Sequence, residues 1–271
     1  MTKPLVSVIM GVYNSEKTLD ASIKSILNQT YEKWEFIICD DCSSDNTYEK
    51  LMEYKNAYPD KFIILKNENN MRLATSLNRC LDVAQGEFIA RMDGDDISLP
   101  KRLESQVNFL QNNVKYDVVG SSIILFGDDG ERGVRYFEGD VDKNIMLTSS
   151  PFAHPTIMMR KSSYDLLNGY TVSALTARCE DKDLWFRFFQ HGMNGFNLSE
   201  PLLKYYENLN INGKKSLKQA INVVKVNYMG YKLLHFSKYK YVYLIKPIIS
   251  AIVPQRFVYY YHKISGKTQR I

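Results

Sequence analysis

The amino-acid sequence predicts an α/β fold with a mainly parallel, Rossmann-like sheet, and three observations support this. Short β-branched runs of four to seven residues alternate with segments of ten to fifteen residues that have apolar positions at helical spacing. Clusters of Gly, Asn, Asp and Ser separate these segments. The 271 residues, 45% hydrophobic and 24% charged, have the composition of a folded globular protein. Strands that alternate with helices of this length imply βαβ crossovers.

Each element follows from a local pattern. The run LVSVIM is a short buried strand, and in the segment after it the apolar residues recur at helical spacing, with Asn14 or Ser15 as the expected cap. Gly86 and Gly192 mark helix ends. We expect strands at 5–10, 34–40, 61–67, 87–93, 118–127 and 198–207, a loop at 128–133 that forms a hairpin or an excursion, and helices at 15–29, 48–58, 72–86, 101–113, 180–192, 214–236 and 239–264.

The ends of these strands carry the polar residues of interest. In open parallel sheets, ligands bind at the carboxyl ends of the strands. That rule places Tyr13, Asp40, Asp41 and the acidic stretch 93–96 on one rim of the predicted sheet.

Localisation and redox state follow from what the sequence lacks. Residues 1–14 show no small-residue cleavage site, and the apolar segments near the C-terminus fall short of the roughly 20 residues that span a bilayer. Cys39 and Cys42 form a C-x-x-C, but no second pair at zinc-ligand spacing accompanies them. We therefore expect a cytosolic chain whose four cysteines are free thiols.

Charge is distributed unevenly along the chain. From Lys204 onward there are eleven Lys and two Arg against a single acid, Glu207, a net charge of +12. Because the whole chain carries +5, residues 1–203 carry −7. A basic tail on an acidic body suggests contact with an anionic surface, either nucleic acid or the cytoplasmic leaflet of a membrane.

The stretch RMDGDDISLP (91–100) places Asp93, Asp95 and Asp96 directly after a buried strand. Asp93 and Asp95 are two residues apart, so in an extended segment their side chains leave the same face. Carboxylate oxygens without nearby His or Cys suit Mg²⁺ or Mn²⁺. The alternative interpretation is an Asx-rich turn followed by a helix cap.

Several motifs, in this order, resemble the family 2 glycosyltransferases of bacterial surface-polysaccharide synthesis. They are SVIMGVYNSEKTLDASIKSILNQTYEKWEFIICDDCSSDNT, GEFIARMDGDDISLPKRLESQ, HPTIMMRKS and EDKDLWFRF, and the resemblance covers about residues 4–205. It implies a GT-A fold, a UDP-sugar donor, a divalent cation (Mn²⁺ or Mg²⁺) and inversion at the anomeric carbon. We therefore expect a catalytic domain at 1–205 and a basic helical extension at 206–271.

The resemblance also implies roles for single residues. Tyr13 would lie against the uracil, Asp41 would accept its N3–H, and Asp95 would be the main metal ligand. Asp96 would bind donor hydroxyls or cap the next helix. The residues expected to bind the nucleotide-sugar are Val12, Tyr13, Asn14, Asp41, Arg72, Asp93, Gly94 and His154, and those expected to bind the metal are Asp95 and Asp93.

Two acids open the helix predicted at 180–192. Asp181 matches the general base of the family, which would take the proton from the acceptor hydroxyl, and Glu180 is its nearest rival. The alternative is that both acids only complement the helix dipole. His154 lies in a His-Pro pair that the family often has, and a structural role remains open for it.

The basic tail contains ten of the nineteen tyrosines and apolar positions at helical spacing, among them Ile221, Val224, Tyr228 and Tyr231. Lys and Tyr around apolar faces are typical of helices that lie in a membrane interface. The alternative is that these helices pack on the protein. Nucleic acid is excluded as a partner because no recognised nucleic-acid fold accompanies the charge.

The sequence thus predicts an inverting glycosyltransferase that moves a hexose or N-acetylhexosamine from UDP to a saccharide hydroxyl. The acceptor is expected to be polyprenyl-linked, which places the enzyme at the inner face of the cell membrane. Two alternatives stay open. One is a sugar-1-phosphate nucleotidyltransferase, although GVYNSEKTLD is a poor match to its Gly-rich loop, and the other is an inactive scaffold that retains the fold.

Overall fold

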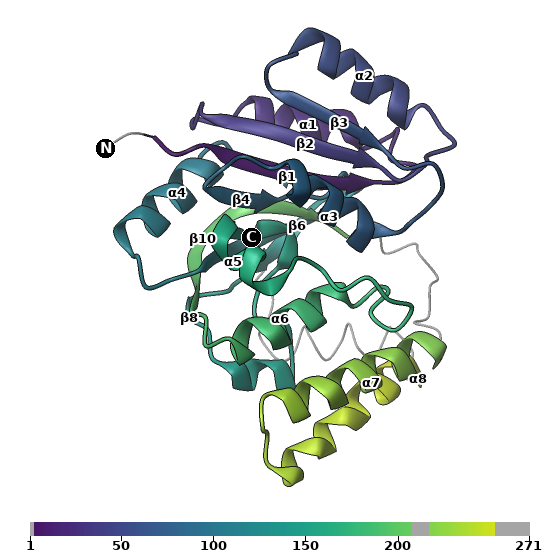
Figure 1. Cartoon of the computed structure of the whole chain (residues 1–271), viewed down its shortest axis with the longest axis vertical. Coiled ribbons are helices and arrows are strands. Elements are labelled where there is room, and N and C mark those ends of the chain that lie inside the picture. Colours follow the sequence, from purple (N-terminus) through teal and green to yellow (C-terminus); the bar gives the residue numbers. More distant parts are fainter. Residues whose placement is uncertain (1–2, 208–216, 253–271) are drawn as a thin grey trace.

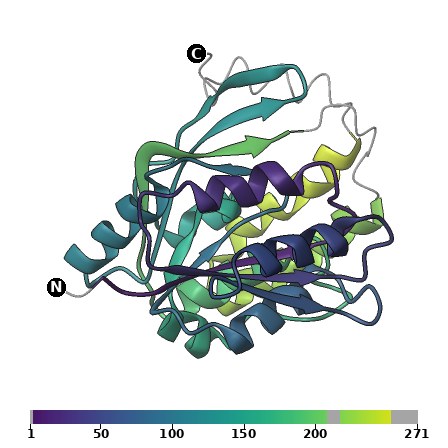
Figure 2. The same cartoon turned by 90° about the horizontal axis from the view of Figure 1, so that it is seen from above.

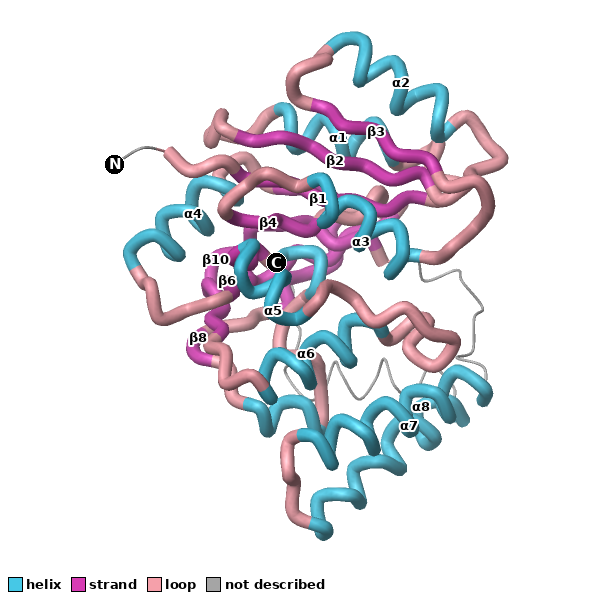
Figure 3. The backbone as a smooth tube through the Cα atoms, viewed as in Figure 1, coloured by secondary structure: helices cyan, strands magenta, loops and turns pink. Residues whose placement is uncertain are grey.

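The structure is a computed structural model that describes residues 3–207 and 217–252. A mixed sheet forms its centre, with strand order β3-β2-β1-β4-β9-β6-β10-β5 (Figure 1). The strands on this path are β1 (Val6–Val12), β2 (Trp34–Asp40), β3 (Phe62–Lys66), β4 (Phe88–Arg91), β5 (Ile97–Ser98), β6 (Val118–Gly127), β9 (Met158–Arg160) and β10 (Gly195–Tyr206). Helices lie on both sides of the sheet (Figure 3).

The first half of the sheet is parallel, as predicted. β2 and β4 flank β1, and β3 pairs with β2 on its far side. The short strand β9 then runs antiparallel between β4 and β6, while β6 and β10 are again parallel. β7 (Gly130–Arg135) forms a hairpin with β6 and begins inside the loop expected at 128–133 (Figure 2). β8 (Gly139–Asp140) pairs with β10. The strands β5, β8 and β9 are too short to leave a periodic pattern in the sequence.

Alternating side chains of the strands enter two separate cores. Val8 and Met10 of β1 face α1 (Leu19–Leu27), α2 (Thr47–Ala57) and α4 (Arg102–Asn112), whereas Ile9 faces the opposite core. On that side pack α3 (Leu73–Val83), α5 (Lys161–Leu167) and α6 (Glu180–Gln190). Because both faces of the strands are buried, β1 and β2 read as nearly continuous apolar runs.

The expected cap of α1 is wrong. Thr18 precedes the helix and makes no side-chain capping bond. Asn14 Oδ1 instead accepts from Ser44 N at 2.8 Å, so its side chain joins the β1–α1 loop to the β2–α2 loop. Ser15 contributes its backbone carbonyl, which accepts from the amide of Thr18 at 3.1 Å. A contact distant in sequence therefore outweighs the local capping preference.

The C-terminal extension packs one face against α6. Its helix α7 (Leu217–Leu233) is followed by η3 (Lys238–Ile245) and α8 (Lys246–Ile252), and the rest of the predicted helix 239–264 lies outside the described residues. An ideal Cβ at Gly230 would lie 2.3 Å from the ring of Phe186, so only glycine permits this approach. Tyr231 is fully buried beside it. Tyr231 of the predicted apolar stripe thus contacts protein, whereas Ile221 and Tyr228 are exposed.

In the described part of the chain, no helix combines the length and the apolar character that crossing a bilayer requires.

Candidate functional site

The carboxyl ends of β1, β2 and β4 converge on one edge of the sheet. The strand register pairs Val12 with Asp40 and Ile9 with Arg91, so the loops that follow these strands are neighbours. Gly94 lies in the loop after β4, and an ideal Cβ there would be 3.0 Å from a methyl group of Val12. This close approach places the acidic loop against the end of β1.

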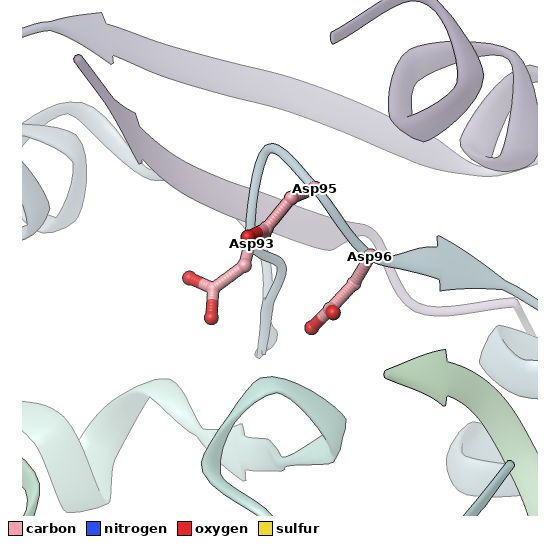
Figure 4. Close-up of side chains that lie close together, drawn as sticks. All are labelled: Asp93, Asp95 and Asp96. Atoms are coloured by element: carbon pink, nitrogen blue, oxygen red, sulfur yellow. The ribbon is translucent and has the colours of Figure 1, made fainter. Parts of the chain in front are cut away.

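Three carboxylates meet in that loop (Figure 4). Asp93, Asp95 and Asp96 each offer an oxygen within 4.8 Å of the others. β4 ends at Arg91, so they lie in a turn and not on one strand face as expected. Partial burial and the charge of Asp93 raise the pKa of Asp95 to about 6. Burial, together with both neighbouring charges, raises the pKa of Asp96 well above its usual value.

Two buried arginines hold the cluster in place, and neither was identified from the sequence. Arg91 forms a two-pronged ion pair with Asp93, with N···O distances of 2.6 and 2.8 Å. Arg102 is fully buried and donates to the backbone carbonyl of Arg91 at 2.6 Å. Ser22 Oγ also donates to the carbonyl of Asp93. Asp93 is therefore oriented before any ligand arrives.

The remaining acceptors fit a divalent cation. Asp96 Oδ1 accepts from Tyr206 N at 2.9 Å, but its buried Oδ2 has no hydrogen-bond partner among the described residues. Asp96 does not cap α4, because Lys101 precedes that helix without a side-chain cap. Like charges this close repel each other unless a proton or a cation is shared. An all-oxygen donor set suits Mg²⁺ or Mn²⁺.

A second group of expected residues lies at the ends of β1 and β2. Asp41 is 4% exposed, and its carboxylate accepts from Asn67 Nδ2 (2.6 Å), Met71 N (2.8 Å) and Arg72 N (2.7 Å). Its own amide donates to the Val12 carbonyl. Asp41 therefore fixes the start of α3 and retains limited capacity to accept from a ligand. Asn67 is a further residue that the sequence reasoning missed.

Tyr13 and Arg72 present side chains at the same edge. The Tyr13 side chain is 50% exposed directly after β1. Arg72 has φ of 70° and ψ of 164°, a backbone region that is essentially reserved for glycine. Its side chain is exposed, and within residues 3–207 and 217–252 its guanidinium makes no ion pair. The hydrogen bonds that the amides of Met71 and Arg72 donate to Asp41 hold the backbone in this conformation. A non-glycine residue that is kept in a strained conformation suggests a function for its side chain.

An open cleft of about 1130 Å³ extends from the acidic cluster. Asp93 and Arg91 line one part of it, and Glu180 and Asp181 from the first turn of α6 line another. Burial, with the Asp181 charge adding to it, raises the pKa of Glu180. The fold therefore brings together in one cleft acids that the sequence separates by almost ninety positions.

His154 also lines this cleft. It lies in η2 (His154–Thr156), where Nε2 is 3.0 Å from the hydroxyl of Tyr170 and the ring meets Trp185 edge-on. Nδ1 is buried and has no hydrogen-bond partner in the part of the chain that the structure describes. Burial, and then the charge of Arg91, lower the pKa of His154 well below its usual value. The lowered pKa favours the neutral imidazole at neutral pH.

Comparison with proteins of known sequence places this geometry in context. The chain is 44% identical over 260 residues to EpsE of Bacillus subtilis, a protein named as a glycosyltransferase, covering 96% of this chain and 94% of that protein. It is 41% identical over 127 residues to WfgD of Escherichia coli, named a UDP-Glc:alpha-D-GlcNAc-diphosphoundecaprenol beta-1,3-glucosyltransferase, covering 45% and 49%.

Solved structures share the fold. TarS 1–349 of S. aureus in complex with UDP-GlcNAc superposes with a TM-score of 0.66 at 20% identity, covering 93% of this chain and 82% of that one. The mannosyltransferase PcManGT of Pyrobaculum calidifontis, in complex with GDP-Man and Mn²⁺, has a TM-score of 0.60 at 14% identity, covering 98% and 80%. The expected GT-A fold is thereby confirmed. The model of the family described as Glycosyl transferase family 2 matches residues 7–167, and the chain belongs to that family.

Proposed function

We propose that this glycosyltransferase moves a hexose or N-acetylhexosamine from a UDP-sugar to a hydroxyl of a lipid-linked saccharide, with inversion. The observation that carries the proposal is the single cleft lined by Asp93, from the carboxylate cluster, and by Glu180 and Asp181. A cation site and a base that open into one space are what inversion requires, because attack and departure occur on opposite sides of one carbon.

Each acid has a distinct part in this proposal. A divalent cation held by Asp95 and Asp93 would neutralise the charge of the departing UDP. Asp181 takes the proton from the acceptor hydroxyl, and Glu180 is the alternative base, favoured by its raised pKa. Arg91 holds the carboxylate of Asp93 in its orientation through their two-pronged ion pair.

The donor binds at the ends of β1 and β2. The exposed ring of Tyr13 offers a platform for a base, and Arg72 adds a cation beside it. The Asp41 carboxylate already accepts hydrogen bonds from Asn67 and from two backbone amides. It accepts the N3–H of uracil through the lone pair that remains. TarS with UDP-GlcNAc and the UDP-Glc in the name of WfgD support a uridine nucleotide, whereas PcManGT with GDP-Man provides the alternative.

In this proposal the acceptor is anchored in the membrane by its lipid. The name of WfgD, which includes a diphosphoundecaprenol acceptor, supports this. Of the nineteen exposed large apolar side chains in the described residues, ten lie between Leu217 and Ile249. Residues 217–252 also carry six Lys and no acid. This surface lies at one end of the molecule, on α7, η3 and α8 (Figure 1). Apolar and cationic side chains together favour the anionic cytoplasmic leaflet.

A thermal-shift series tests the nucleotide and the metal. UDP, UDP-Glc, UDP-Gal, UDP-GlcNAc, UDP-GalNAc and GDP-Man are each added with Mn²⁺ and with EDTA. Binding to the native state raises the melting temperature by mass action. We expect stabilisation by UDP that requires Mn²⁺ and is largest with one UDP-sugar. The absence of any response to uridine nucleotides would favour the inactive-scaffold alternative.

Point substitutions test the membrane surface, because truncation would uncover the face of α6 that α7 covers. Tyr239→Ser with Val242→Ser changes two side chains that are 75% and 67% exposed. We expect this double variant to co-sediment with anionic vesicles at least several-fold less than the wild type. Val114→Ser, at a position that is 84% exposed beyond α4, is the matched control. Equal sedimentation of all three proteins would refute the membrane contact.

A further inference from the structure

The cleft continues beyond the acidic residues to a wall that the roles above leave unused. Residues 135–138, 148–153 and Asn197 of β10 line this part. Tyr13, Asp41 and Arg72, the residues proposed to bind the nucleotide, are not part of the cleft lining. A ligand in this wall would therefore approach Glu180 and Asp181 from a side that the proposed nucleotide does not occupy.

Buried polar atoms without partners gather along this wall. Seven such side-chain atoms occur in the described residues, and Ser150 Oγ, Asn197 Oδ1 and His154 Nδ1 all belong to residues that line the cleft. Asn197 is 3% exposed, and its Nδ2 donates to the carbonyl of Pro151 at 3.0 Å, which ties the strand to the wall. Buried polar atoms are normally satisfied, so this concentration points to hydrogen bonds that a ligand supplies.

An aromatic ring lies in the same wall. The Tyr136 side chain is 53% exposed and Tyr136 lines the cleft, so ring surface is open at this wall. The C–H face of a pyranose is apolar and slightly positive, whereas the face of an aromatic ring is negative. An exposed ring beside unsatisfied hydroxyl and amide groups is therefore suited to a sugar.

The charges of the wall exclude a phosphate as the ligand. The guanidinium of Arg135 is paired with Glu207, with 3.6 Å between Arg135 Nη2 and Glu207 Oε1. The other ionisable residues nearby in the lining are the acids Glu138, Asp140 and Asp142. Lys246 of α8 lies at the edge, where it donates to the backbone carbonyl of Thr148. A ligand against acidic side chains must be uncharged or cationic.

We propose that Tyr136, Ser150 and Asn197 form the subsite for an uncharged sugar unit of the acceptor, with His154 at its inner end. The ring of Tyr136 supports the apolar face of the sugar and Ser150 binds a hydroxyl of it, while Asn197 holds this wall in place through its hydrogen bond to Pro151. This assignment rests on the proposed transferase function for its biological meaning. The subsite itself is defined by the geometry of the wall and can be tested without turnover.

Saturation-transfer NMR with simple glycosides tests the subsite. Methyl glycosides of glucose, galactose, N-acetylglucosamine and N-acetylgalactosamine are each added to the full chain with and without UDP and Mg²⁺. We expect at least one glycoside to receive saturation from the wild type, with a signal that falls at least fivefold in Tyr136→Ala and in Ser150→Ala. Tyr136→Phe keeps the ring and should keep the signal. Ser199→Ala, at an exposed position on β10, is the control for serine removal.

The outcomes separate this subsite from the proposed function. Equal signals in the wild type, Tyr136→Ala and Ser150→Ala would overturn the assignment, and so would the absence of a signal from every glycoside in the wild type. Affinity for UDP should stay unchanged in all variants. A wild type that binds a glycoside through Tyr136 but shows no affinity for UDP would support the subsite and contradict the nucleotide-sugar proposal.

Discussion

Arg72 allows backbone strain and side-chain function to be measured separately. Its φ of 70° and ψ of 164° fall in a region that costs a non-glycine residue about 1–3 kcal/mol. Arg72→Gly removes this strain from the folded protein. Glycine also has more conformational freedom in the unfolded chain, which lowers the free energy of unfolding by about 0.5–1 kcal/mol. The bonds from the amides of residues 71 and 72 to Asp41 remain in the variant, because they use only the backbone.

The midpoints of these two ranges, about 2 and about 0.75 kcal/mol, lead us to expect that Arg72→Gly raises the free energy of unfolding by about 1 kcal/mol. For a chain of 271 residues this is a rise in melting temperature of about 2–4 °C. Arg72→Ala is the matched variant, since alanine also lacks the guanidinium but remains as strained as arginine. Both variants should bind UDP more weakly than the wild type if the cation reaches the nucleotide.

The assay is thermal unfolding of the three proteins, with and without UDP and Mn²⁺. Equal stability of the glycine and alanine variants would refute the strain. Unchanged UDP-dependent stabilisation in both variants would refute the role of the guanidinium in donor binding, whatever the backbone result.

The remaining predictions concern the acids and the buried histidine. Asp95→Asn should abolish the Mn²⁺-dependent part of UDP binding in a calorimetric titration, and unchanged affinity would contradict its assignment as metal ligand. Asp181→Asn should keep donor binding while transfer falls about 10²- to 10⁴-fold; such a loss in Glu180→Gln and not in Asp181→Asn would move the base to Glu180. Because His154 has a lowered pKa, the unfolded chain takes up a proton that the folded chain does not, so stability falls below pH 6.5 by up to about 1.4 kcal/mol per pH unit. Urea unfolding from pH 7.5 to 5.5 should show a smaller loss in His154→Gln than in the wild type or in the exposed control His191→Gln, and equal slopes would refute the contribution of His154.

The sequence determined those features that depend on local pattern. The alternation of buried runs and amphipathic segments predicted the parallel half of the sheet and its helices, because burial on both faces of a strand and on one face of a helix leaves different periods. The position of Asp93, Asp95 and Asp96 after a strand placed them on the sheet edge, since parallel strands share that edge. The family could also be read from its spaced motifs, and it is confirmed.

Only the tertiary structure decided the contacts between distant residues. Asp41 looks free in the sequence, yet its carboxylate is largely used by amides thirty positions away. The tail looks like a surface helix, yet Gly230 brings it against Phe186 of α6. The cleft wall of Tyr136, Ser150 and Asn197 has no sequence pattern at all. Local periodicity records whether a side chain is buried, whereas its partner depends on which segments the fold brings together.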